Sequence, residues 1–193
     1  TNVVGRFTPF INTRDSGKFG EVEALISLGS VDINANVQSI NARGMAFDES
    51  GDHLYVATRN PDALYAYDIV PADSETGSGT QHRLAARVPI EDNPSNIVVH
   101  RTPRGRKLVY VLSFQDQSIQ VVAPESGTVV DTIALDASPY DMVIDEAPGR
   151  CRQPGDTCRG YVSLFDDAPR RNADCEAEGP LCGSLGVVDL DPE

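Results

Sequence analysis

The chain has 193 residues, a formal net charge of −13 at pH 7, four cysteines, no tryptophan and a hydrophobic content of 40%. This length is ample for a buried core, and the hydrophobic content excludes a disordered chain. The acidic excess argues against nucleic acid as a partner, because phosphate binding depends on clustered Lys and Arg. No apolar run approaches the roughly 20 residues of a membrane span, so the sequence predicts no transmembrane segment.

The predicted elements are short β-strands that recur in phase along the chain. Three repeats begin at Asn41, Asn93 and Ser138, each with a polar lead, a short apolar run and a turn that contains Gly. Runs of β-branched and aromatic residues bounded by Gly, Pro, Asn and Asp are typical of strands and hairpins. In chain order the predicted strands are Asn41–Asp48, His53–Thr58, Ala63–Asp68 and Arg83–Ile90, then Asn93–His100, Lys107–Ser113, Ser118–Ala123 and Thr128–Leu135, then Ser138–Asp145, Gly160–Phe165 and Ser184–Asp189.

The spacing of the repeats predicts the fold class. Tyr55 to Asp68 and Tyr110 to Ala123 are both separations of 13 residues. Four antiparallel strands in each stretch of about 40–50 residues indicate β-propeller blades, whereas a sandwich would not repeat in this phase. We therefore predict an all-β chain with blades at 41–92, 93–137 and 138–193, preceded by an incomplete or irregular blade at 1–40.

The segment Asn93–Leu135 resembles a YVTN-type repeat. It has a Pro lead, a Gly turn, a strand with Tyr110-Val111 and a Ser126-Gly127 turn before a second apolar strand. The stretch Leu54–Asn60 is similar to the signature strand of that family. The resemblance implies a propeller, usually seven-bladed, of the kind found in surface-layer-like secreted or surface proteins and in some lactonase-like enzymes.

The number of repeats predicts an incomplete arc. The third repeat stops after its third strand, and about three to four blades cannot close a seven-bladed ring. We expect the chain to be a piece of a longer or cleaved polypeptide. The alternative is a small four-bladed ring in which residues 1–40 supply strands such as Arg6–Ile11 and Val22–Leu28.

All four cysteines lie in the third repeat. Cys151 and Cys158 bracket six residues, and so do Cys175 and Cys182. Proximity favours these two pairs as disulfides, with a crossed pairing and a four-cysteine zinc site as alternatives; zinc ligand pairs usually lie only two to four residues apart. Disulfides predict an oxidising location, which is the periplasm, the outer surface or the exterior of the cell.

Two insertions are predicted to be surface loops. Residues 71–81 are rich in Gly and Ser, as in flexible loops. The insertion before the last strand gathers carboxylates without the alternating Asp and Asn of a calcium loop, so we interpret it as solvated. Its acidic residues are Asp166, Asp167, Asp174, Glu176 and Glu178.

Candidate binding residues follow from aligning the repeats. Gly44, Asn96 and Asp141 occupy equivalent positions at the start of each first strand, where ligands gather at the channel mouth of propellers. We take Arg43, Asn96, Tyr140 and Asp141 as candidate binding residues. The resemblance to gluconolactonase-type propellers implies calcium on Asn96 and Asp141 as an alternative to strand capping. His100, aligned with Asp48 and Asp145, is interpreted as the polar start of a turn.

No nucleophile-elbow, phosphate-loop or dinucleotide motif is present in the sequence, and no catalytic residue or cofactor is predicted. We expect a secreted or cell-surface propeller that acts as a non-enzymatic binding or scaffold module. Its partner would be protein or glycan, including the remainder of its own propeller or a neighbouring chain. The alternatives are a calcium-dependent lactonase-type hydrolase and a structural subunit of a surface layer or filament.

Overall fold

A computed structural model describes residues 30–33, 36–39, 41–71, 81–147, 149–165 and 184–190. The chain divides into two compact units, Thr1–Ile40 and Asn41–Glu193. In the first unit the described residues form an antiparallel hairpin of β1 (Ser30–Ile33) and β2 (Asn36–Ser39), which the sequence patterns did not predict.

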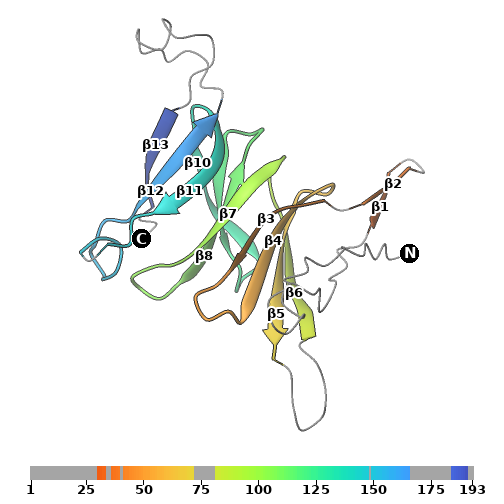
Figure 1. Cartoon of the computed structure of the whole chain (residues 1–193), viewed down its shortest axis with the longest axis horizontal. Helices are drawn as coiled ribbons and strands as arrows, with labels where there is room; N and C mark the ends of the chain where they lie inside the picture. The colour runs from red at the N-terminus through yellow and green to blue at the C-terminus, as the bar shows by residue number, and fades with distance from the viewer. Residues whose placement is uncertain are drawn as a thin grey trace, which may run out of the picture. The chain divides into compact units, whose positions relative to one another are not determined.

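The second unit is all-β and contains three antiparallel sheets in which each strand pairs with its neighbour along the chain (Figure 1). Sheet 1 holds β3 (Asn41–Phe47), β4 (His53–Arg59), β5 (Ala63–Val70) and β6 (Gln81–Pro89). Sheet 2 holds β7 (Pro94–Arg101), β8 (Lys107–Ser113), β9 (Ser118–Ala123) and β10 (Thr128–Ala134). Sheet 3 holds β11 (Ser138–Ile144), β12 (Arg159–Phe165) and β13 (Ser184–Asp189).

All eleven strands predicted from residue 41 onward are present, with ends that differ by at most a few residues. The turns after β3 and β7 contain Gly51 and Gly105, whose φ angles of 77° and 85° favour glycine. The described strands form no closed ring. The predicted strands Arg6–Ile11 and Val22–Leu28, nearly all of the predicted 71–81 loop and the acidic insertion lie outside the described residues.

The first strands of the three sheets bring the sheets together, because β3 packs beside β7 and β7 beside β11. Two hydrophobic cores fill the spaces between successive sheets. The core between sheets 1 and 2 contains Tyr55, Ala57, Leu64, Ala66, Val88, Ile97, Val109, Val111 and Val122. The core between sheets 2 and 3 contains Leu108, Tyr110, Leu112, Ile119, Val121, Met142, Cys151, Cys158, Val162, Val188 and Leu190.

Strands β8 and β9 of sheet 2 are therefore buried on both faces. Along β8, Val109 and Val111 belong to one core, while Leu108, Tyr110 and Leu112 belong to the other. This arrangement explains why β8 is a continuous apolar run instead of the alternating pattern of a half-exposed strand. Each fully buried Val or Leu contributes about 1.5–3 kcal/mol.

No helix among the described residues is long and apolar enough to cross a membrane.

Candidate functional site

The candidate binding residues lie at a β-bulge near the start of each first strand. The register shifts between Ala42 and Met45 in β3, between Pro94 and Asn96 in β7 and between Pro139 and Asp141 in β11. A bulge leaves extra residues that the ladder does not pair, which are Arg43 and Gly44 in β3, Ser95 in β7 and Tyr140 in β11. Asn96 and Asp141 are the first paired residues after their bulges. The positions that align in the sequence repeats therefore also lie at the same structural feature, a β-bulge in the first strand of each sheet.

Asn96 and Asp141 lie side by side. Asn96 Nδ2 donates a hydrogen bond of 2.7 Å to Asp141 Oδ1. Each side chain also accepts a hydrogen bond of 2.8 Å from the next backbone amide, which belongs to Ile97 in one case and to Met142 in the other. The pair therefore satisfies amide groups at two bulges and links sheet 2 to sheet 3.

The third aligned position, Gly44, brings sheet 1 to the same place. A Cβ added to Gly44 would lie 2.8 Å from the backbone nitrogen of Ile97 and 2.9 Å from Cα of Asn96. Only glycine allows this close approach of two backbones. Arg43 is exposed one residue before Gly44, and Tyr140 is 64% exposed one residue before Asp141.

The Asn96–Asp141 pair has few oxygen atoms to offer a calcium ion. Asp141 Oδ1 already accepts two hydrogen bonds, and Asn96 turns its amide nitrogen toward Asp141. Calcium takes six to eight oxygen ligands. The arrangement fits the strand-capping role better than the ligand role.

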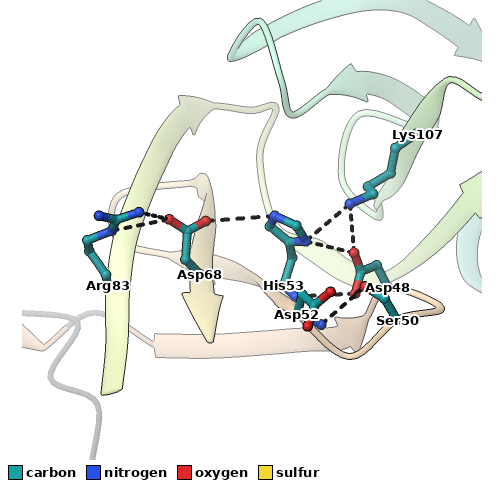
Figure 2. A network of polar contacts seen from close by, with 7 residues as sticks. All are labelled: Asp48, Ser50, Asp52, His53, Asp68, Arg83 and Lys107. Atoms are coloured by element: carbon teal, nitrogen blue, oxygen red, sulfur yellow. Dashed lines mark hydrogen bonds and ion pairs between the residues drawn. The ribbon is translucent and has the colours of Figure 1, made fainter. Parts of the chain in front are cut away.

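A second polar cluster lies at the opposite end of the same strands, after β3 (Figure 2). Asp48 Oδ2 lies 2.7 Å from His53 Nδ1 and 2.6 Å from Lys107 Nζ. Asp48 Oδ1 accepts hydrogen bonds from the Ser50 hydroxyl and the His53 amide. The side chains of Asp48 and Lys107 are 3% and 10% exposed, so this is a buried ion pair between sheets 1 and 2.

Burial alone would raise the pKa of Asp48, but the hydrogen bonds from Lys107 and His53 outweigh it and hold that pKa well below its usual range. Asp48 is therefore ionised at any pH near neutrality. On the other side of the ring, His53 Nε2 lies 3.8 Å from Asp68 Oδ1, and Arg83 donates to the same carboxylate (Figure 2). The cluster joins two sheets and continues across sheet 1.

His100 occupies the equivalent position in sheet 2. It is 3% exposed, with Nδ1 lying 3.0 Å from Glu146 Oε1 and Nε2 lying 3.2 Å from Cys151 Sγ. Both partners belong to the segment that follows β11, so this contact links sheet 2 to sheet 3. The sequence predicted a turn-starting residue here and missed the buried contact, for which the only signal is the departure from Asp at this repeat position.

Cys151 and Cys158 form a disulfide, as their spacing predicts. Cys175 and Cys182 lie outside the described residues. A surface pocket of about 450 Å³ opens beside this disulfide, where the hairpin turns of the three sheets meet. It is lined by Glu49, His100, Arg101, Thr102, Pro103, Gly105, Glu146, Cys151 and Arg152.

Comparison with known protein families and with curated protein sequences finds no match to this chain.

Proposed function

We propose that the chain is an arc of a YVTN-type β-propeller and acts as an extracytoplasmic binding or scaffold module. The observation that carries this proposal is that tyrosines at equivalent repeat positions lie in successive cores between the sheets. Tyr55 belongs to the core between sheets 1 and 2, and Tyr110 belongs to the core between sheets 2 and 3. The repeat thus packs each sheet through its tyrosine face onto the next sheet, as the blades of a propeller do. The Cys151–Cys158 disulfide supports an extracytoplasmic location.

The tyrosine face of sheet 3 is the surface through which such a module would bind. Tyr161 pairs with Val143 on one side and Val187 on the other, so the three side chains share that face. Val143, Leu185 and Val187 are 62%, 65% and 59% exposed. In sheets 1 and 2 the corresponding face is covered by another sheet, so the partner that fits this face is a further sheet of the same kind.

The partner that we propose for this face is a second copy of the chain. Met45, Phe47 and Leu84 are exposed on the face of sheet 1 turned away from sheet 2, beside Tyr65 and Tyr67, which are buried on the same face. That face is the counterpart of the surface that each tyrosine face contacts within the chain. Contact between the two faces would be head-to-tail and would generate rings or filaments. A scaffold module that assembles in this way would also act as a structural subunit of a surface layer or filament.

Sedimentation velocity over a range of protein concentrations tests the proposal. We expect self-association that strengthens with added salt, because a net charge of −13 on each copy opposes an apolar contact at low ionic strength. Val187→Glu should weaken the association at least about 10-fold, since it desolvates a charge in the contact. Val130→Glu is the matched control, because Val130 is 44% exposed on sheet 2. A chain that stays monomeric at all concentrations contradicts the proposal.

The calcium-dependent hydrolase remains as a second candidate because Asn96 and Asp141 do meet at the predicted position. Isothermal titration with calcium distinguishes it from the binding module. The strand-capping role predicts no saturable heat at millimolar calcium. Heat that saturates at one equivalent and disappears in Asp141→Asn would instead favour the hydrolase.

A further inference from the structure

A buried cluster of three metal-binding residue types lies beside the pocket between the hairpin turns. The donor atoms of His100, Cys151 and Cys158 all lie within 4.8 Å of one another, and all three residues are buried. His100 is the penultimate residue of the first strand of sheet 2, whereas the cysteines lie between the first two strands of sheet 3. The fold therefore brings together ligands that are about fifty residues apart in sequence.

The orientation of the imidazole is that of a metal ligand. Glu146 Oε1 lies 3.0 Å from Nδ1, where a carboxylate accepts a hydrogen bond from Nδ1–H; in the neutral ring this arrangement leaves the lone pair on Nε2. That lone pair is directed at Cys151 Sγ, 3.2 Å away. Neither sulfur of a disulfide carries a hydrogen, so the lone pair receives no hydrogen bond from this neighbour. Metal-bound histidines characteristically have such a carboxylate on the other ring nitrogen.

We propose that reduction of the Cys151–Cys158 disulfide converts this cluster into a zinc site with one imidazole and two thiolate ligands. A dithiol reductant supplies two electrons and two protons: the protein S–S bond breaks, two cysteine thiols form, and the reductant closes its own disulfide. Zinc then displaces the two thiol protons into solvent and forms two Zn–S bonds and one Zn–N bond. Two thiolates neutralise the charge of the ion, and water occupies the fourth position.

The distances suit this conversion. Zn–S bonds of about 2.3 Å and Zn–N bonds of about 2.0–2.1 Å place tetrahedral ligand atoms roughly 3.5–3.8 Å apart. Donor atoms that already lie within 4.8 Å need only small side-chain rotations to reach these separations. Cys151 lines the pocket, which gives the reductant and the ion a route to the cluster.

Cobalt(II) binding to the 193-residue chain tests the proposal, in a Cys175→Ser, Cys182→Ser background that removes the other two cysteines. The protein is reduced with dithiothreitol, desalted without oxygen and titrated with Co²⁺. We expect one equivalent to bind with thiolate-to-cobalt charge-transfer and tetrahedral d–d absorption, and none to bind to the oxidised protein. Glu146→Gln should weaken binding about 10–100-fold, and His100→Gln should weaken it at least as much. His82→Gln is the matched control, because His82 lies on β6 of sheet 1, and it should leave Co²⁺ binding unchanged.

Circular dichroism distinguishes a loss of metal binding from a loss of folding. Every variant is first compared with its parent in the oxidised state, where its spectrum should be unchanged. If reduction unfolds the chain, added Co²⁺ should refold it, because metal binding is then coupled to folding. The proposal is overturned if the reduced chain neither binds nor refolds with Co²⁺, or if His100→Gln binds it as tightly as the parent does.

Discussion

Asp48 joins two sheets through a single buried carboxylate. It accepts hydrogen bonds from its own hairpin and lies 2.6 Å from Lys107 Nζ of sheet 2. Because both charges are nearly inaccessible to water, neither can be removed without leaving the other buried and unpaired. The pair therefore links the two hairpins, and removing either partner should be costly.

Asp48→Asn should lower the free energy of unfolding by about 2–4 kcal/mol, because the amide cannot neutralise Lys107 and presents a nitrogen to other donors. Urea denaturation followed by circular dichroism measures the change. Asp52→Asn is the control, since Asp52 is exposed in the same turn and its substitution should cost less than about 0.5 kcal/mol. Equal effects of the two substitutions would show that the ion pair contributes nothing specific.

Asp48 should also make the free energy of unfolding depend on pH in the acidic range. The folded-state pKa of Asp48 is lowered below its ordinary value of 3.8, so its contribution is fully present above that pH and is lost as the pH falls further. The difference in unfolding free energy between the parent and Asp48→Asn should therefore shrink steadily below about pH 4. Urea denaturation of both proteins from pH 6 to pH 2.5 tests this. A difference that stays constant across the range would contradict it.

At the scale of the strand, the β-bulge is what makes the three first strands equivalent. The aligned positions lie at these bulges: Gly44 is within the bulge of β3, and Asn96 and Asp141 directly follow the bulges of β7 and β11. Two of them form a hydrogen bond between sheets, and the third lets the backbones of β3 and β7 approach. Neighbouring first strands are thus held together at their bulges in two ways: by a side-chain hydrogen bond between β7 and β11, and by close backbone approach between β3 and β7.

Gly44→Ala should lower the free energy of unfolding by about 1–3 kcal/mol, because the new Cβ would meet backbone atoms of Ile97 and Asn96 below 3.0 Å and these cannot rotate away. Thermal unfolding measures the loss. Gly186→Ala is the comparison, because its Cβ would meet the flexible end of the Leu164 side chain at 3.2 Å and should be tolerated better. If Gly186→Ala proved the more damaging, the close backbone approach would not be limiting.

The strands from residue 41 onward could be predicted because apolar runs and turn residues are local signals that recur in each repeat. The equivalence of Asn96 and Asp141 could be predicted for the same reason. The pairing of Asp48 with Lys107 could not, because the two residues are 59 positions apart and meet only once the sheets pack. His100 with Glu146 and Cys151 was missed for the same reason, since a lone histidine carries no local sign of its partners.

At the scale of the whole molecule, sheet 2 is shared by both cores and is the element on which sheets 1 and 3 depend. Its strands β8 and β9 are buried on both faces, whereas β3 and β13 each carry exposed apolar side chains. Local opening should therefore be cheapest at β3 and β13 and most costly at the centre of sheet 2. Cooperativity between the outer sheets must pass through this central one.

Leu112→Ala should destabilise all three sheets together, by about 2–5 kcal/mol, because it opens a cavity in a sheet that both cores share. Hydrogen exchange followed by mass spectrometry should show the slowest amides in β8 and β9 of the parent, and faster exchange in every sheet of the variant. Val70→Ala, at a side chain 43% exposed on sheet 1, should leave the pattern unchanged. Faster exchange confined to sheets 2 and 3 in Leu112→Ala would mean that sheet 1 folds without its neighbour, and the central role of sheet 2 would be wrong.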